Sequence, residues 1–404
     1  MSNTALSLSE TLPPEVRTHV HWTKEGGLQN TPHNWMVILK EDPRMAGRLM
    51  HNSFANKAVF DGKEVNDNCV MGIALWMARN YHINPRNIKL LASVVDYAAQ
   101  AAGKFDPLRD YFNSLPAWDK TKRIDTFLSD GMGAAKTHLI RRISRCFFLA
   151  ACRRGMNPGT KVDEILILQG KQRMGKSTAA AALCPDPAWF SSSQSNLKIG
   201  DRDAVYCIQG KFIFEIAELD SFRGKSATQL KAFFSETVDR VRPVHGAYFE
   251  DLPRRTIFIG TTNEMSFLRD YTGNRRYRPV IVQKVDVKYI TDNRDQLWAE
   301  ALHGVNAGEP HWFSDDDEDS LEQYNERFQE IDPWEEPISQ YMEGYMCPTM
   351  VEVLQGALGM KLDKIDKRCQ LRAAAILRRL GYASKQTRAG GTRKQVWVEV
   401  NDGS

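Results

Sequence analysis

The sequence predicts an α/β protein: a layered parallel sheet with flanking helices, preceded by a helical domain and followed by a winged-helix-like domain. Three observations lead to this fold class. The chain has 404 residues, which exceeds the span of one typical core. Short apolar runs alternate with helical stretches from about 160 to 285, as in layered α/β domains. A glycine-rich loop follows the first of these runs, and a basic stretch ends the chain.

The first part of the chain is expected to hold two segments. Residues 1–32 are polar with several glycines and prolines, which favours a flexible lead-in. A helix-rich domain is predicted over 33–115, because apolar residues recur there at mixed helical spacing. The stretches that carry this pattern are Trp35 to Leu39, Cys69 to Tyr81 and Leu90 to Ala102.

The core domain is expected over 116–312. A helix from Lys136 to Arg154 is predicted to lead into the sheet, since apolar residues return every three or four positions and arginines occupy the other face. Short apolar runs follow as expected strands: Ile165–Leu168, Ala204–Ile208, Phe212–Phe214, Thr256–Gly260 and Val280–Val282.

The loop after the first expected strand has the pattern Gly-x-x-x-x-Gly-Lys-Ser/Thr, and an alanine-rich helical stretch follows it. In such a loop backbone N–H groups surround phosphate oxygens, the lysine reaches the β- and γ-phosphates, and the next hydroxyl ligates Mg²⁺. The sequence therefore predicts an ATP site with Mg²⁺; a glycine-rich turn without a ligand is the alternative. The expected nucleotide-binding residues are Gly170, Gln172, Met174, Gly175, Lys176, Ser177 and Thr178.

An apolar run that ends in acidic residues follows, from Lys211 to Glu218. One carboxylate at such a strand end serves Mg²⁺-bound water and another serves the attacking water. Glu215 and Glu218 are the candidates, with Ser177 and Glu215 as the expected metal ligands. The two acids lie three positions apart rather than adjacent, so the division of roles stays open, and an edge strand with exposed acids is the alternative.

Two later segments complete the predicted catalytic set with Lys176. Asn263 ends an expected strand and fits a sensor that orients water near the γ-phosphate, although an ordinary turn would also suit it. Arg275 and Arg276 lie in a basic turn from Gly273 to Pro279. A guanidinium there can act as an arginine finger on a neighbouring subunit, or belong to a solvated loop.

These motifs resemble the virulence-associated E family of phage, plasmid and genomic-island proteins, related to superfamily 3 helicases of the AAA+ class. The resemblance covers about 105–285 and implies a hexameric ring ATPase that translocates on DNA when a mobile element replicates. A primase or other replication protein is a candidate partner. The segments that carry it are Pro107–Phe112, Leu115–Asp119, Gly170–Thr178, Phe214–Leu219, Pro253–Thr256, Phe258–Glu264 and Thr272–Tyr277.

In superfamily 3 helicases the interval between the acidic strand and the sensor strand carries a hairpin whose tip contacts single-stranded DNA. Pro243 and Gly246 favour a turn in this interval. Cationic side chains beside it are candidates for phosphate contact, while a solvent-exposed hairpin is the alternative. The candidate DNA-binding residues are Lys231, Arg240, Arg242 and His245.

The C-terminal region is predicted as an acidic segment, a linker or solvated helix over 313–337, and a winged-helix-like domain over 338–404. From 361 to 400 there are eleven Lys or Arg residues against three carboxylates, which suggests contact with a polyanion such as double-stranded DNA. A winged helix used for protein contact is the alternative. The candidate DNA-binding residues are Arg372, Arg378, Arg379, Arg393 and Lys394.

Composition narrows the remaining possibilities. No apolar run approaches the roughly 18 residues of a membrane span, and the N-terminus has no signal-peptide pattern, so we expect a cytoplasmic protein without a membrane partner. The seven cysteines form no Cys-x-x-Cys pair. An ATP-dependent DNA helicase or translocase is the predicted function. The alternatives are a nucleotide-switched DNA-binding regulator that interferes with rival replication, and a small-molecule kinase.

Overall fold

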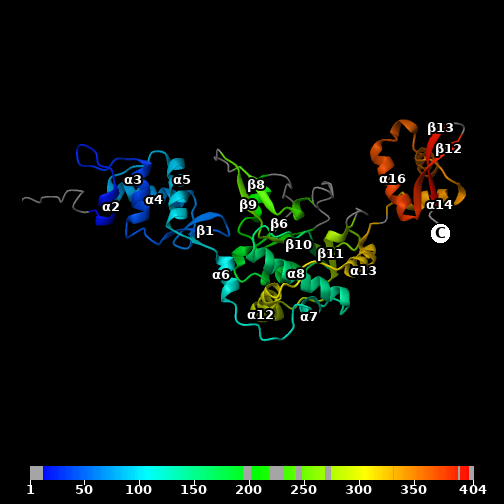
Figure 1. Cartoon of the computed structure of the whole chain (residues 1–404), viewed down its shortest axis with the longest axis horizontal. Helices are drawn as coiled ribbons and strands as arrows, with labels where there is room; N and C mark the ends of the chain where they lie inside the picture. Colours follow the sequence, from blue (N-terminus) through cyan, green and yellow to red (C-terminus); the bar gives the residue numbers. More distant parts are fainter. Residues whose placement is uncertain are drawn as a thin grey trace, which may run out of the picture. The chain divides into compact units, whose positions relative to one another are not determined.

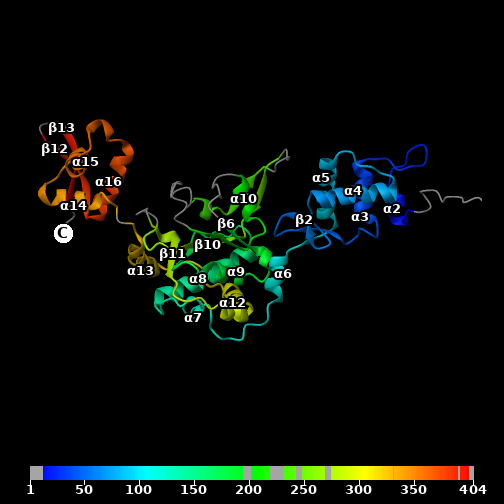
Figure 2. The same ribbon diagram turned by 180° about the vertical axis from the view of Figure 1, so that it is seen from behind.

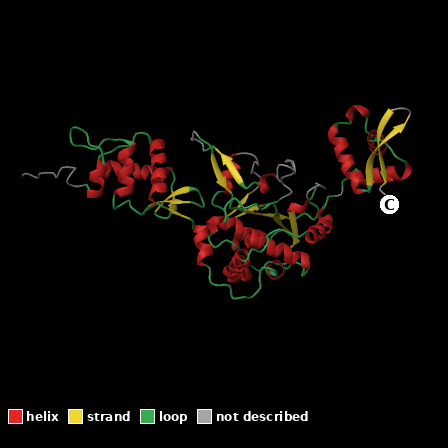
Figure 3. Cartoon of the chain, in the orientation of Figure 1, coloured by secondary structure: helices red, strands yellow, loops and turns green. Residues whose placement is uncertain are grey.

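The computed structural model divides the chain into two compact units, each of which mixes helices and strands (Figure 3). The first comprises the chain up to Asn263 together with Val280–Asp317, and the second comprises Glu264–Pro279 and the chain from Glu318 onward. The structure describes residues 12–193, 202–218, 232–242, 248–268, 274–330, 332–389 and 392–399.

From residue 12 onward, where the structure describes the chain, the N-terminal part of the first unit packs four helices with a four-stranded sheet of order β3-β2-β1-β4. The helices are α2 (Pro14–His19), α3 (Pro32–Glu41), α4 (Asp67–Tyr81) and α5 (Ile88–Ala102). The strands are β1 (Leu49–Asn52), β2 (Lys57–Phe60), β3 (Lys63–Glu64) and β4 (Lys104–Phe105). The predicted helical stretches are confirmed as α3, α4 and α5, and the domain also contains this sheet of short strands, which sequence reasoning missed.

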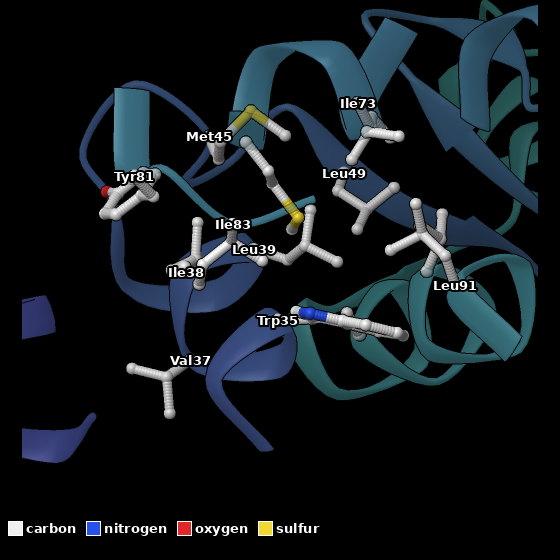
Figure 4. Close-up of a cluster of buried hydrophobic side chains, with 14 of the residues drawn as sticks. Trp35, Val37, Ile38, Leu39, Met45, Leu49, Ile73, Tyr81, Ile83 and Leu91 are labelled. Atoms are coloured by element: carbon white, nitrogen blue, oxygen red, sulfur yellow. The ribbon is translucent and has the colours of Figure 1, made fainter. Parts of the chain in front are cut away.

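Figure 4 shows the core of this part, where Trp35 and Leu39 of α3 meet Ile73 of α4 and Leu91 of α5. Val16 of α2 belongs to the same buried cluster, as do Leu12 and Val20. The expectation of a flexible lead-in is therefore wrong for the described residues before α3. Leu12, Val16 and Val20 recur every four positions and pack on the domain, but the polar residues between them hide this spacing in the sequence.

The core part of the first unit is built on a five-stranded sheet of order β11-β5-β10-β7-β6. The pairings of β5 with β10, β10 with β7, and β7 with β6 are parallel, which confirms the predicted parallel α/β core. The strands are β5 (Ile165–Gln169), β6 (Phe190–Ser193), β7 (Ile213–Ile216), β10 (Ile257–Thr262) and β11 (Tyr277–Ile281).

Helices cover the sheet, with α8 and α12 packed together on one side of it (Figures 1 and 2). The helices are α6 (Pro107–Ser114), α7 (Phe127–Asp130), α8 (His138–Met156), α9 (Lys176–Ala182), α10 (Arg202–Ile208) and α12 (Val287–Asn306), with the 3-10 helix η1 (Pro187–Trp189). The 3-10 helix η3 (Asn274–Arg276) belongs to the second unit. Trp298 of α12 is fully buried, and its ring contacts Phe112, Phe148 and Phe212. The expected helix from Lys136 to Arg154 is confirmed as α8.

One expected strand of the core is a helix instead. The apolar run from Ala204 to Ile208 lies in α10, where Ala204 and Ile208 are buried four positions apart. A short apolar run fits a buried strand and a helix face equally well, so its sequence alone could not decide between them.

The acidic segment after α12 folds as a helix. It contains α13 (Asp315–Asn325) and η4 (Glu326–Phe328), and the side chains of Leu321 and Phe328 are fully buried. Asp317 is also buried, and its carboxylate accepts a hydrogen bond from Arg142 of α8 at 3.0 Å. Of the two expectations, linker or solvated helix, the structure has the helix, and its acids are partly paired rather than fully solvated.

In its described residues, 332–389 and 392–399, the C-terminal part of the second unit has three α-helices and a two-stranded antiparallel sheet around a separate core. The elements are α14 (Glu335–Gly344), α15 (Met350–Leu358), η5 (Leu362–Lys364), α16 (Lys367–Arg379), β12 (Tyr382–Ala389) and β13 (Thr392–Glu399). Val353 of α15, Leu377 of α16 and Trp397 of β13 are buried together in this core. No helix among the described residues is long and apolar enough to cross a lipid bilayer.

Candidate nucleotide site and DNA-contacting surfaces

The strand order of the core sheet brings three predicted elements to one edge. The strand β10 lies between β5 and β7, and all three run parallel. The glycine-rich loop follows β5, Asn263 follows β10, and Glu215 lies near the end of β7. Since parallel strands share their carboxyl edge, residues from three distant stretches of sequence meet there.

The loop that follows β5 depends on two of its glycines. A Cβ on Gly170 would lie 2.7 Å from the carbonyl oxygen of Val282 and 3.3 Å from the sulfur of Met174. Gly175 has φ of +83°, a left-handed conformation that an L side chain adopts only with strain. The backbone of the loop therefore needs both residues to be glycine in this geometry.

Gly170→Ala is expected to weaken nucleotide binding about five- to a hundredfold, because a methyl group must displace the Val282 carbonyl or the loop. Equilibrium binding of a fluorescent ATP analogue measures the effect. Gly72→Ala is the matched control, since Gly72 lies in α4 with nothing within 4 Å of the added Cβ. Equal affinity of the Gly170→Ala variant and the wild type would contradict the steric argument.

The ammonium of Lys176 is held at the centre of this edge. It donates to the carbonyl oxygens of Gly170 at 2.5 Å and Lys171 at 2.9 Å, and to the amide oxygen of Asn263 at 3.1 Å. The side chain is buried, and this burial lowers the pKa of Lys176, an effect that the charge of Glu215 opposes. The buried ammonium of Lys176 is therefore suited to exchange its hydrogen bonds to neutral oxygens for contacts with an anion.

Glu215 accepts hydrogen bonds from hydroxyl groups on two neighbouring elements. Its Oε1 accepts hydrogen bonds from Ser177 at 2.7 Å and from Thr261 at 2.8 Å. Its side chain is fully buried, and its Oε2 has no hydrogen-bond partner among the described residues. A buried carboxylate oxygen without a partner is costly unless something else binds it. A hydroxyl and a carboxylate in contact, with one oxygen free, are the oxygen ligands that Mg²⁺ prefers.

Glu218 differs from Glu215 in its exposure, its position relative to β7 and its backbone conformation. It is exposed, it lies beyond the end of β7, and its φ is +48°. The structure gives the contact with Ser177 to Glu215 alone of the two predicted acids. Among the other predicted loop residues, Gln172 and Thr178 are exposed and Met174 is half-buried, while Ser177 is exposed but its hydroxyl reaches inward to Glu215.

Sequence reasoning missed Thr261, which fixes Glu215 from the neighbouring strand. The register pairs Ile259 with Glu215, so Thr261 lies two residues further along β10. Its signal in the sequence was weak: a threonine two positions before Asn263 is also common in an ordinary strand. Only the pairing of β10 with β7 gives it a role.

The two predicted finger arginines lie in η3, in the second unit. Arg275 is exposed and Arg276 is half-buried. Arg278, two residues on, is buried instead, and it donates to Glu318 of α13 at 2.8 Å. The ion pair between Arg278 and Glu318 therefore anchors the segment that carries the exposed Arg275.

The predicted hairpin between the acidic strand and the sensor strand is present. The antiparallel strands β8 (Val238–Val241) and β9 (Glu250–Pro253) form it. Arg240 is exposed on β8, 3.8 Å from Asp251, and Arg242 is exposed beyond the end of that strand. Two further candidate contacts, Lys231 and His245, lie outside the described residues.

The candidate cations of the C-terminal part fall into two groups. Arg372 is bound by Asp332 at 2.7 and 2.8 Å, and Arg379 is paired with Glu335. Arg378, Arg393 and Lys394 are exposed. The first two therefore have their charges taken up by carboxylates within the unit, which the sequence could not reveal.

Three solved structures resemble the chain, all of them apo structures of the C-terminal region of NrS-1. They share 10–11% sequence identity with it, cover 87% of this chain and 96% of their own, and give TM-scores of 0.44–0.46. A comparison with curated proteins gave no match. Residues 112–330, more than half of the chain, match the virulence-associated protein E-like domain. The chain therefore belongs to the virulence-associated protein E-like family.

Proposed function

We propose that this protein is a Mg²⁺-dependent ATPase of the AAA+ class that drives a helicase or translocase along DNA during replication of a phage or other mobile element. One observation carries the proposal. Lys176 contacts Asn263, and Ser177 contacts Glu215, at the shared edge of three adjacent parallel strands. A phosphate-binding lysine, a sensor amide and a metal-binding carboxylate are the groups that phosphoryl transfer to water requires.

Each residue has a defined part in this proposal. The loop from Gly170 to Thr178 binds the phosphates through its backbone N–H groups, and Lys176 leaves its carbonyl partners to neutralise phosphate charge. Ser177 and Glu215 hold Mg²⁺, which supplies charge stabilisation on the transferred phosphoryl group. Asn263 orients the attacking water, and the exposed Glu218 accepts its proton.

The rest of the chain supplies the DNA contacts and the assembly. We propose a hexameric ring, with the β8–β9 hairpin on single-stranded DNA and the C-terminal part on duplex, in a winged-helix arrangement. The rings of Tyr248 and Phe249 are exposed, and Arg240 lies 5.7 Å from the ring centroid of Phe249. These side chains support the hairpin assignment, because stacking and cationic contacts together suit single strands. A primase or other replication protein is the proposed partner.

ATP hydrolysis with and without single-stranded DNA tests the proposal. A motor is stimulated by DNA, whereas a nucleotide-switched regulator hydrolyses slowly with or without it, and a small-molecule kinase does not respond to it. Sedimentation with a non-hydrolysable nucleotide is the second measurement. A monomer at every concentration that still hydrolyses ATP at full rate contradicts the ring.

Arg275→Ala and Arg276→Ala are each expected to leave nucleotide binding intact, and loss of the finger is expected to lower hydrolysis by about a thousandfold. The reason is that a finger acts on the transition state in a neighbouring subunit rather than on the bound nucleotide. Binding of a fluorescent analogue and steady-state hydrolysis are measured side by side. Arg327→Ala is the control, since Arg327 lies on η4 of the same unit with its guanidinium over Tyr324. Full turnover in both variants would remove the finger assignment.

A further inference from the structure

The helix α16 carries arginines on two different faces. Arg372 and Arg379 lie seven positions apart, and so do Leu371 and Arg378, so each pair shares one face at 3.6 residues per turn. The two pairs are offset by one position, which places the two faces about 100° apart around the helix. The two faces have different surroundings.

The first face is occupied by the protein itself. Arg372 donates two hydrogen bonds to Asp332 and stacks at 3.9 Å from the ring centroid of Trp334, while Arg379 pairs with Glu335. These contacts lower the pKa of Asp332, although its burial opposes them. This face attaches α16 to the start of α14, and its positive charge is neutralised there.

The second face, the outer face of α16, is centred on Leu371 and Arg378 with Lys367 beside them, and Arg368 lies at its edge, between Leu371 and the first face. All four side chains are exposed, including Leu371 at 61%. No carboxylate lies within ion-pair distance of Arg368 or Arg378 in the described part of the chain. The outer face is therefore a cationic surface with an apolar side chain at its centre.

The strand β13 extends this surface on one side. Arg393 and Gln395 alternate with Lys394, so they share a face of the strand with Trp397. Trp397 is buried in the core with α16, and Arg378 lies 5.8 Å from its ring centroid. Arg393 consequently lies on the same side of the sheet as Arg378. Lys394 lies on the opposite side, where its charge reaches Glu352 of α15.

We propose that the outer face of α16, together with Arg393, binds double-stranded DNA, with α16 in the major groove. The proposal deepens the duplex-binding role given above and rests on that part of the proposed function. Arginines on one helix face reach phosphates and guanine edges, and an exposed leucine between them suits the methyl group of thymine.

The side chains of this surface favour double-stranded DNA over single-stranded DNA. Single-stranded DNA is held by aromatic side chains on which bases stack, and α16 contains no aromatic residue. A protein partner of acidic character remains as an outcome of the test. The sequence-based candidates are divided by this proposal: Arg378 and Arg393 bind DNA, whereas Arg372, Arg379 and Lys394 do not.

The test is fluorescence anisotropy of a labelled duplex of arbitrary sequence with the full chain, in the absence of nucleotide, over a range of salt concentrations. Arg368→Ala and Arg378→Ala are each expected to weaken duplex binding at least about fivefold. Each lost phosphate contact is expected to reduce the slope of log affinity against log salt by about 0.9. Lys394→Ala is the matched control and removes the same charge from the other side of the sheet, with an expected change below about twofold.

Arg372→Ala is a second comparison, read together with its thermal unfolding because it leaves Asp332 unpaired. The proposal is overturned if Lys394→Ala weakens binding as much as Arg368→Ala, if neither outer-face variant changes the affinity, or if a single strand of equal length binds the C-terminal surface with the same dependence on Arg368. ATP hydrolysis by the wild-type chain is measured separately. If the chain does not hydrolyse ATP, the duplex-binding result is unaffected. If the duplex proposal fails, the ATPase assignment is likewise unaffected.

Discussion

Lys176→Ala is expected to reduce ATP hydrolysis by at least about a hundredfold. The ammonium is the one cation that the structure holds within hydrogen-bond distance of the loop carbonyls and Asn263 together, in the part of the chain that it describes. Removing a charge that stabilises the transferred phosphoryl group typically costs two to three orders of magnitude in rate. Steady-state phosphate release, with and without DNA, measures the loss.

A matched variant separates this effect from a general loss of positive charge. Lys161→Ala removes an exposed lysine whose ammonium lies 3.3 Å from Asp163, and it is expected to hydrolyse ATP at the wild-type rate. Thermal unfolding of both variants is compared, because Lys176 is buried and its removal leaves two carbonyl oxygens without their donor. Retention of more than about a tenth of the wild-type rate in a folded Lys176→Ala variant would contradict the assignment.

Arg254→Met is expected to lower the free energy of unfolding by about 3–5 kcal/mol, the largest effect on stability that we predict. Arg254 follows β9, and its guanidinium binds both oxygens of Asp239 on β8, at 2.5 and 2.6 Å. Both side chains are buried, and a third N–H group donates to the carbonyl oxygen of Phe233. Methionine keeps most of the volume but leaves the Asp239 carboxylate buried without its cation. Chemical denaturation followed by far-UV circular dichroism measures the change.

The double variant Asp239→Leu with Arg254→Met is the control for this explanation. If the cost comes from an unpaired charge, removing the second charge as well should recover much of the lost stability. A double variant no more stable than Arg254→Met alone would show that the loss comes from packing, for example from the ring of Phe233, which lies 4.5 Å from the guanidinium carbon. The hairpin root would then be held by contact rather than by charge.

The candidate site residues at the end of β5, β7 and β10 could be located from the sequence because their signals are local. Glycine, lysine and hydroxyl positions within the Gly170–Thr178 loop follow from the backbone geometry of that loop alone. The buried strands β5, β7 and β10 appear as short apolar runs that end in polar residues. The order of these strands was not in the sequence, and only the order brings Thr261 to Glu215.

The parts that sequence reasoning missed depend on contacts between distant residues. Asp317 reads as one acid in an acidic run, yet its partner Arg142 lies 175 positions earlier in the chain. The strands β1 and β2 have four residues each, too short for alternation to separate them from loops. The arginines of α16 looked alike in the sequence, and only the position of Asp332 and Glu335 distinguishes their two faces.

The placement of β10 limits how the end of that strand can respond to its surroundings. All six residues from Ile257 to Thr262 are buried, and hydrogen bonds hold both edges of the strand. Sliding its main chain would disturb two neighbours at once, whereas the exposed Asn263 amide just beyond it can turn about its own bonds once its hydrogen bond from Lys176 is exchanged. In the proposed ATPase, the absence of a γ-phosphate would therefore be registered by rotation of the Asn263 amide, while the main chain of β10 stays in place.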